Sequence, residues 1–342
     1  MEKVAVAILN WNGHEFLKKF LPSVVEYSDI NNVSIYVIDN GSTDGSITFL
    51  RAYYPTVKIV LLAQNYGFAG GYNKGLEKIK AEYYVLLNSD VEVTKGWLEP
   101  MLEVLENNKN IAVCQPKLKS YVNRDEFEYA GAAGGFIDKF GFAFCRGRLF
   151  NVFEKDVAQY NTKSDIFWAT GACLFIRSEI YFNAGGLDND FFAHMEEIDL
   201  CWRILSRGYK IVYEPKSEVF HLGGATLSKT NPHKTFLNFR NNLFLLYKNL
   251  PKHNFYQTIF ARLILDGIAA IKFLLSFEFR NFWAVFTAHL QFYLSISKLK
   301  SKRENNLLLT TTILHTTMYN KSIVADFFYR GKKYFSDLHF NP

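Results

Sequence analysis

A polar segment that follows a hydrophobic run has the chemistry of a metal-binding turn. Residues 83–87 are strand-forming, and Asn88, Ser89 and Asp90 follow them directly. A carboxylate at the carboxyl end of a buried strand lies at the edge of an α/β sheet, where ligands bind. Its oxygens suit a hard divalent ion, which in turn holds phosphate oxygens. Asp90 is therefore a candidate metal ligand, although a helix-capping aspartate is the simpler interpretation of this residue alone.

Three other polar segments follow predicted strands in the same part of the chain. Asn10 and Asn12 follow the first strand, and Asp39 ends the second. A glycine-rich loop over residues 64–71 follows the third, and its candidate residues are Asn65, Gly67, Gly70 and Gly71. In a parallel sheet these segments share one edge, which is where a nucleotide binds. Glycines there let backbone amides approach a ligand, although a tight strand-to-helix turn explains them equally well.

The third group of candidates is acidic and lies near residue 200. Glu196, Glu197 and Asp199 begin a predicted helix, and three carboxylates so close together cannot all be buried unpaired. The helix dipole favours anions at this position, so the group is either surface charge or a general base at the mouth of a site. Further along, His221 precedes two glycines. A lone histidine is more often structural, but Asp90 would give it a partner as a metal ligand.

Alternating strands and helices are predicted to position these residues. Strands are expected at residues 4–9, 33–38, 57–63 and 84–87, and helices at 15–27, 46–53, 73–80 and 97–107. A strand over 167–176 and then a loop and helix over 188–208 follow. This order predicts a doubly wound, mainly parallel α/β sheet. The glycine loop matches neither GxGxxG nor GxxxxGK[ST], which argues against a dinucleotide fold and a P-loop NTPase.

The charge of the 342-residue chain is unevenly distributed. Residues 1–228 carry 23 Lys+Arg and 28 Asp+Glu, net −5, whereas residues 229–342 carry 16 and 5, net +11. We therefore predict a catalytic domain over 1–228 and a basic, aromatic-rich helical region over 229–342. The basic region suits an anionic membrane surface, and no nucleic-acid-binding motif accompanies it. The four cysteines lack disulfide or zinc spacing, which suits a reducing compartment.

Two hydrophobic segments of the basic region are close to membrane length. Arg262, Asp266 and Lys272 interrupt residues 258–277, and residues 282–296 are short, so neither matches a spanning helix of about 20 apolar residues. We expect both to lie in a bilayer interface with snorkelling basic side chains. An ordinary helical subdomain and a spanning or re-entrant helix are the alternatives. A strand begins almost at the first residue, so no signal peptide is expected, and we predict a cytoplasmic or peripheral membrane location.

Taken in order, these motifs resemble glycosyltransferase family 2, and in particular the rhamnosyltransferase-like branch of the inverting GT-A enzymes. The resemblance runs from Val4 to about Asn242. It implies that a nucleotide sugar contacts residues at the four strand ends, namely Asn10, Asn12, Asp39, Asn65, Gly67, Gly70, Gly71, Asn73, Asn88 and Ser89. It also implies a divalent metal cofactor, Mg²⁺ or Mn²⁺, held by Asp90 and His221.

The resemblance also implies that Glu197 is the catalytic base, since it holds the second position of the acidic motif of the family. Two residues depart from the family pattern. Asn88 replaces the first carboxylate of the metal motif, and Glu197 replaces the usual aspartate. Glu196 and Asp199 remain alternatives for the base.

The implied reaction moves a sugar from a nucleoside diphosphate sugar to a glycan acceptor. The glycine loop suggests dTDP-rhamnose as donor, and the resemblance implies a lipid-linked acceptor in cell-surface polysaccharide synthesis. A sugar nucleotidyltransferase is the first alternative, but such enzymes carry a Gly- and Arg-rich loop where residues 10–14 read Asn-Trp-Asn-Gly-His. An oxidoreductase and a non-catalytic, membrane-bound nucleotide-binding protein are the others.

Overall fold

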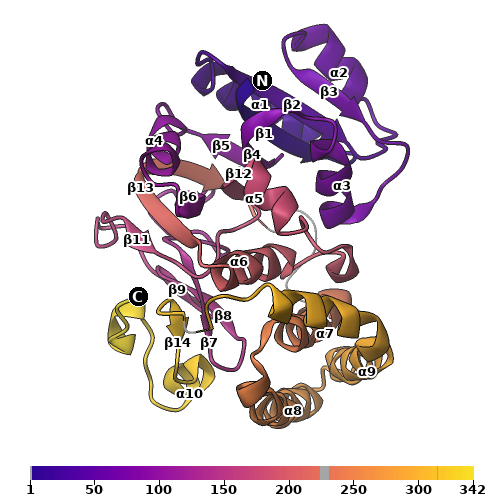
Figure 1. The fold of residues 1–342 in the computed structure, drawn as a ribbon, viewed down its shortest axis with the longest axis vertical. Helices are drawn as coiled ribbons and strands as arrows, with labels where there is room; N and C mark the ends of the chain where they lie inside the picture. Colours follow the sequence, from indigo (N-terminus) through magenta and orange to yellow (C-terminus); the bar gives the residue numbers. More distant parts are fainter. Residues whose placement is uncertain (1, 224–230, 314) are drawn as a thin grey trace.

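The computed structural model describes residues 2–223, 231–313 and 315–342, and its centre is a large mixed sheet (Figure 1). The strand order is β11-β13-β6-β12-β4-β1-β2-β3, with β5 paired to β13. The strand bounds are β1 Glu2–Asn10, β2 Val33–Asp39, β3 Lys58–Leu61, β4 Ala81–Asn88, β5 Val91–Val93, β6 Ile111–Ser120, β11 Ser164–Asp165, β12 Cys173–Arg177 and β13 Lys210–His221. The helices of this part are α1 His14–Tyr27, α2 Ser46–Tyr53, α3 Gly67–Leu76, α4 Glu99–Asn107, α5 Ser178–Asn183, η1 Asn189–Phe191 and α6 Glu196–Ser206.

Strands β3, β2, β1 and β4 are parallel neighbours, which confirms the predicted α/β class. Alternate residues of β1 are buried on opposite faces, because helices cover a parallel sheet on both sides. Val4 packs in the cluster that includes Leu17 of α1, and Ala5 in the cluster that includes Tyr72 of α3. The register pairs Asn10 with Asp39 and Leu9 with Asn88, so the carboxyl ends of these strands meet at one edge, as predicted.

Several elements differ from those predicted. Strand β12 begins at Cys173, not at residue 167, and pairs antiparallel with β4 and β6. Helix α3 begins at Gly67, inside the segment that we expected to be a loop. Strand β6 was not predicted, because its buried polar residues interrupt the hydrophobic pattern. Gln115 donates to the carbonyl of Gly131, and Lys117 pairs with Asp156, so each is satisfied by a distant segment.

A second sheet of five short strands lies beside the first (Figure 1). Its strands are β7 Gly135–Asp138, β8 Ala143–Cys145, β9 Arg148–Leu149, β10 Val152–Phe153 and β14 Met318–Tyr319. The last of these comes from the end of the chain and pairs parallel with β7. Aromatic contacts reinforce the pairing, since Phe335 and Phe340 pack on Phe136 with ring centroids 5.2 and 5.4 Å apart. The carboxyl-terminal residues are therefore part of the amino-terminal half of the fold.

Three long helices follow the main sheet, in agreement with the predicted helical extension. They are α7 Pro232–Asn249, α8 Lys252–Leu275 and α9 Phe279–Leu308, followed by α10 Ile323–Phe328 and η2 Phe335–Leu338. Figure 1 shows α7 next to the sheet part and α8 and α9 on its outer side. No helix in the described ranges is long and apolar enough to span a bilayer. The predicted boundary between residues 228 and 229 lies outside the described residues and stays a prediction.

Candidate active site

Side-chain hydrogen bonds tie together the turns after β1 and β2. The amide of Asn10 donates to Asp39 Oδ1 at 3.3 Å and to Ser42 Oγ at 3.2 Å. The side chain of Asn12 accepts from the backbone N–H of Thr43 at 2.8 Å. Asn10 and Asp39 are buried, whereas Asn12 is exposed. The structure thus brings the three predicted residues together, with Asn12 at the surface and the other two inside the turn.

Ser89 and Trp11 also lie at this edge of the sheet. A Cβ atom on Gly13 would be 2.4 Å from Asn10 Oδ1 and 3.8 Å from Ser89 Oγ, so the turn after β4 approaches the turn after β1. Trp11, which we did not single out in the sequence, is 56% exposed here. An exposed aromatic ring offers an apolar surface to a flat ligand such as a nucleobase. Its position between two candidate asparagines was the signal in the sequence that we missed.

The glycine segment is held by Asn40, another residue that the sequence analysis did not select. Its amide donates to Asn65 Oδ1 and to the carbonyl of Gly67, both at 3.0 Å. Gly70 and Gly71 are buried in α3, and a Cβ on Gly71 would lie 2.8 Å from Leu9 Cδ1. Gly71 therefore lets α3 pack closely on the end of β1, whereas Gly70 faces Tyr66 and Asn189. Both glycines lie in a helix that follows a tight turn, which was the alternative to a ligand-binding loop.

The side-chain oxygen and nitrogen of Asn73 both form hydrogen bonds within the protein. Its Oδ1 accepts from the hydroxyl of Tyr181 at 2.6 Å and from the N–H of Leu187 at 3.1 Å, while its Nδ2 donates to the Leu187 carbonyl at 2.7 Å. Nδ2 also lies 3.2 Å from Asn189 Oδ1. Asn73 therefore connects α3 to the segment that leads into α6, and the geometry gives it a positioning role.

Asp90 and His221, which are 131 positions apart in the chain, meet at the end of β4. The distance from His221 Nε2 to Asp90 Oδ1 is 3.2 Å, and Nδ1 lies 3.4 Å from Glu128 Oε1. Burial opposes a charged imidazole, but Glu128 and Asp90 outweigh it and raise the pKa of His221 to about 10. Burial likewise works against ionised Asp90, but the hydrogen bond from His221 lowers the pKa of this carboxyl. The sequence analysis missed Glu128, which completes this charged group.

Once the metal displaces the proton of the His221 imidazole, Asp90 and His221 could supply two ligands of a divalent ion. Neighbouring ligands of an octahedral ion, each about 2.1 Å from it, lie roughly 3 Å apart, which matches the 3.2 Å separation. Within the described part of the chain, no group of three or more His, Cys, Asp or Glu residues could hold a metal ion. Water and substrate phosphates would have to supply the other ligands, as is usual for Mg²⁺ in phosphate-binding sites.

The three acidic residues of α6 differ in their surroundings. Asp199 is fully buried and paired, with Arg203 Nε 2.9 Å and Lys248 Nζ 2.8 Å from Oδ2, and with Asn249 Nδ2 2.8 Å from Oδ1. Burial disfavours its charge, but Lys248 and Arg203 prevail and lower the pKa of Asp199. Its oxygens are therefore engaged in joining α6 to α7, which is a structural role.

Replacing Asp199 by Asn should destabilise the fold. The change leaves Arg203 and Lys248 in the interior without the negative charge that they share. Lys248 still forms its ion pair with Asp188 at 2.5 Å. We expect the free energy of unfolding to fall by about 3 kcal/mol, the lower end for breaking a buried pair. Urea denaturation measures this change, with Glu196→Gln as the control that removes an unpaired carboxylate. A loss no larger than in the control would contradict the structural role.

Glu196 and Glu197 have no ion-pair partner among the residues that the structure describes. Glu196 is 4% exposed and Glu197 is half-buried, and the Oε2 atom of each lacks a hydrogen-bond donor. Burial raises the pKa of Glu197 to about 7. Burial and then the neighbouring charge of Glu197 raise the pKa of Glu196 well above its usual value. A carboxylate with a pKa near neutrality and a free oxygen is suited to accept a proton.

The segment before these glutamates has an unusual backbone. Phe192, His194 and Met195 have φ angles of 66°, 68° and 75°, a left-handed conformation that is costly for residues other than glycine. Asn241 of α7 holds this segment, since its Nδ2 donates to the carbonyls of Phe191, Ala193 and His194 at 2.9, 2.8 and 2.8 Å. Helix α7 therefore fixes the start of α6. The polar triplet at residues 240–242, inside a hydrophobic helix, was the sequence signal for this contact.

Cys145 is a buried thiol that is influenced by the charges of both candidate groups. Burial raises the pKa of the Cys145 thiol to about 11, and the charges of Glu128 and Glu197 both add to the shift. The thiol thus lies within electrostatic range of both carboxylates. Glu128 in turn lies 3.4 Å from His221, so carboxylates of both candidate groups influence the same thiol.

Comparison with solved structures shows which fold the chain adopts. The chain is similar to GalNAc-T7 in complex with UDP, GalNAc and Mn²⁺, with a TM-score of 0.63 and 16% identity over 92% of this chain and 55% of that chain. It is also similar to residues 1–349 of TarS from S. aureus, with a TM-score of 0.51 and 13% identity over 75% of this chain and 69% of that chain. The fold is that of the GT-A glycosyltransferases.

The family follows from the sequence. The model of glycosyl transferase family 2 matches residues 5–181, and the chain belongs to this family of glycosyltransferases, which confirms the resemblance. One relative is the N-acetylglucosaminyl-diphospho-decaprenol L-rhamnosyltransferase of Mycobacterium tuberculosis, 23% identical over 234 residues, 63% of this chain and 75% of the relative. Another is the low-salt glycan biosynthesis hexosyltransferase Agl10 of Haloferax volcanii, 21% identical over 249 residues, 70% of this chain and 74% of the relative.

Proposed function

We propose that this glycosyltransferase moves a sugar from a nucleoside diphosphate sugar to a hydroxyl of a glycan acceptor, with inversion at the anomeric carbon. The observation that carries the proposal is a pair of carboxylates with opposite surroundings. Asp90 is ionised and paired with His221, as suits a metal ligand, whereas Glu197 is unpaired with a pKa of about 7, as suits a base. GalNAc-T7, which has a similar fold, was solved with UDP and Mn²⁺, and this supports a nucleotide and a divalent ion as ligands of the present chain.

Each residue has a stated task in the proposed reaction. Asp90 and His221 would hold a divalent ion, Mg²⁺ or Mn²⁺, which would supply Lewis-acid stabilisation of the diphosphate leaving group. Glu197 accepts the proton of the acceptor hydroxyl as that oxygen attacks the anomeric carbon. A single displacement by the acceptor oxygen inverts the configuration at the anomeric carbon. Asn241 and Asp199 keep the base in place through the backbone before α6 and through α7.

We also propose a particular acceptor and a particular donor. A lipid-linked oligosaccharide as acceptor, at the cytoplasmic face of a membrane, is supported by the decaprenol-linked substrate in the name of the M. tuberculosis relative and by the net charge of +11 in residues 229–342. The rhamnosyltransferase name of the same relative supports a dTDP-rhamnose donor in cell-surface polysaccharide synthesis.

A nucleotide-sugar turnover assay tests the proposal. The full-length protein is incubated with dTDP-rhamnose, UDP sugars and GDP sugars, with Mg²⁺ or Mn²⁺ and with or without a lipid-linked acceptor, and the released nucleotide is identified. We expect release of a nucleoside diphosphate that depends on the metal and is faster with acceptor. Release of pyrophosphate would indicate a nucleotidyltransferase, and donor binding without any release would indicate a non-catalytic protein. The anomeric configuration of the product tests inversion.

A further inference from the structure

Helix α8 has its polar face inside the protein and its apolar face outside, the reverse of a surface helix in a water-soluble protein. Its three buried residues are Thr258, Arg262 and Asp266, spaced by four positions. The opposite face carries hydrophobic side chains that are between 51% and 82% exposed: Tyr256, Phe260, Ile264, Ile268, Ile271 and Leu275.

The charged residues on the polar face of α8 are paired within the protein. Arg262 forms an ion pair with Asp266 at 2.8 Å, and its guanidinium lies over the ring of Phe142 at 3.9 Å. His289 of α9 reaches Asp266 at 3.1 Å. Paired polar groups inside and hydrophobic groups outside are the arrangement expected of helices whose outer surface meets lipid.

Helix α9 adds a second apolar stripe beside the first. Its inner face packs on α7 through residues such as Ala288 and Phe292, which are buried. Its outer face carries residues that are between 50% and 69% exposed: Phe279, Trp283, Phe286, Leu290 and Leu294. Two neighbouring helices thus expose hydrophobic stripes, which is far more than the scattered exposed hydrophobic residues of an ordinary surface.

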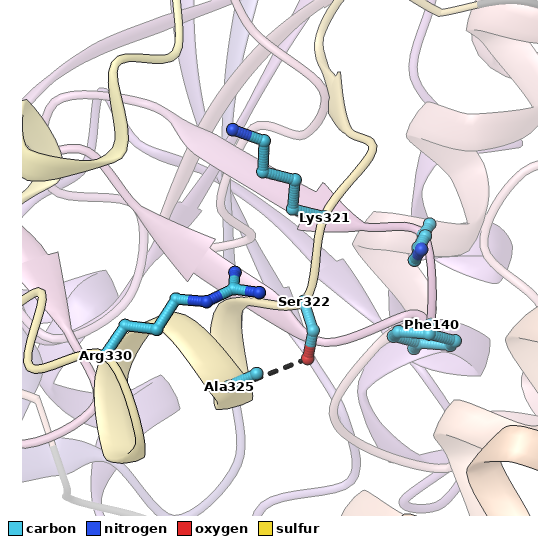
Figure 2. Close-up of a pocket in the computed structure, with 6 residues that line it drawn as sticks. Phe140, Lys321, Ser322, Ala325 and Arg330 are labelled. Atoms are coloured by element: carbon cyan, nitrogen blue, oxygen red, sulfur yellow. Dashed lines mark hydrogen bonds between the residues drawn. The ribbon is translucent and has the colours of Figure 1, made fainter.

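A basic pocket of about 460 Å³ adjoins α8, lined by Lys139, Phe140, Lys321, Ser322, Ala325 and Arg330 (Figure 2). Figure 2 shows Lys321 and Arg330 reaching it from different segments. Arg262 Nη1 lies 3.4 Å from the Phe140 carbonyl, so the pocket and the polar face of α8 are in contact. Across the described ranges, no carboxylate lies within ion-pair distance of Lys139 or Lys321, both of which are exposed. Their charge is therefore available to an external anion.

The end of α10 joins the pocket to the stripe of α8. Lys272 of α8 lies over the ring of Phe328 with its Nζ 5.5 Å from the centroid. Phe328 and the next residue, Tyr329, are 59% and 92% exposed. Aromatic side chains of this kind are favoured at the boundary between headgroups and hydrocarbon.

We propose that α8, α9 and the end of α10 form a docking surface for an anionic lipid bilayer. The apolar stripes would enter the headgroup boundary, and the pocket cations would meet lipid phosphates. The helices lie flat on the bilayer, because insertion of the α8–α9 turn would take Glu278 and Arg280 into hydrocarbon. A second copy of this chain fits the surface less well than a bilayer does, since a symmetric contact would bring the two basic pockets together. This surface goes beyond the proposed function; only its use in reaching a lipid-linked acceptor rests on that function.

Vesicle flotation of the full-length protein tests the docking surface. Vesicles of phosphatidylcholine alone are compared with vesicles that also contain phosphatidylglycerol, at low and high salt. We expect binding to the anionic vesicles and partial release by salt, because charge screening weakens attraction to the surface. A wild-type protein that ignores anionic vesicles at low salt would overturn the proposal.

Matched variants separate the apolar and cationic contributions. Phe260→Gln, Ile264→Gln and Ile268→Gln combined should weaken vesicle binding on the order of tenfold or more. The control combines Tyr53→Gln and Val157→Gln, residues that are 73% and 75% exposed on other parts of the surface, and should bind as wild type does. The triple variant is expected to fold, because all three side chains are exposed, and circular dichroism checks this.

For the pocket, Lys139→Gln with Lys321→Gln should weaken binding to anionic vesicles about fivefold per lysine, from about 1 kcal/mol each. Lys18→Gln with Lys95→Gln is the control, since these lysines are exposed but lie outside the docking surface.

Equal binding by the triple variant and its control would overturn the proposal. So would a dimer, seen by ultracentrifugation, that the triple variant dissociates while vesicle binding is unchanged. Donor turnover without lipid should be the same in all these variants, so its absence in wild type would count against the proposed function alone.

Discussion

Replacing Glu197 by Gln should lower sugar transfer by about 100-fold or more, the usual contribution of a general base. The substitution keeps the size of the side chain and removes only its basicity. Donor affinity should change little, because the base meets the acceptor hydroxyl and not the diphosphate. The measurement is kcat with saturating donor and acceptor, together with the dissociation constant of the donor, for both proteins.

The pH profile makes this prediction specific. Burial raises the pKa of Glu197 to about 7, so in wild type the base is protonated and inactive at lower pH, and turnover should rise as pH passes through about 7. This ascending limb should be absent in Glu197→Gln. Glu196→Gln serves as the matched control and should lower turnover less, since adjacent residues on a helix point about 100° apart. Near-normal turnover of Glu197→Gln would refute the assignment of the base.

Replacing Asp90 by Asn should abolish metal-dependent turnover, with a loss on the order of 1,000-fold, equivalent to about 4 kcal/mol of transition-state stabilisation. Asn88 is already neutral, so no other carboxylate of this turn can take over. His221→Ala is the companion variant and should raise the metal concentration required by roughly 10- to 100-fold without unfolding the protein. Metal titration of turnover measures both, and full activity after treatment with EDTA would contradict the assignment.

The sequence was informative where a local pattern determines structure. Hydrophobic runs that end in polar residues located β1, β2 and β4, and parallel pairing placed Asn10 beside Asp39. The sequence offered Asp90 and His221 as possible partners, but it did not predict the pairing of β5 with β13, which brings these two residues together across 131 positions of the chain.

Contacts that depend on tertiary structure could not be predicted in this way. Asn40 holds the glycine segment, and Asn241 holds the backbone before the base, yet nothing in the local pattern says which distant carbonyl groups these amides meet. Arg262 and Asp266 were read as interruptions of a hydrophobic segment. The structure shows that they form the inner face of α8, and periodicity alone does not tell which face of a helix is inside.

The bonds of Asn241 bear on how this enzyme can be recombined with its relatives. The residues that fix the base are at 191–194 and at 241, and both lie beyond the part of the chain, residues 5–181, that matches the family model. A hybrid joined between these two places would combine a strained turn from one parent with a helix from another that was never selected to hold it. A junction just after α5, before the turn begins, keeps the pair from a single parent. Exchange of everything from that point onward, as one block, keeps the base and the residues that hold it together, but it joins His221 of one parent to Asp90 and Glu128 of the other, so that contact must be matched as well.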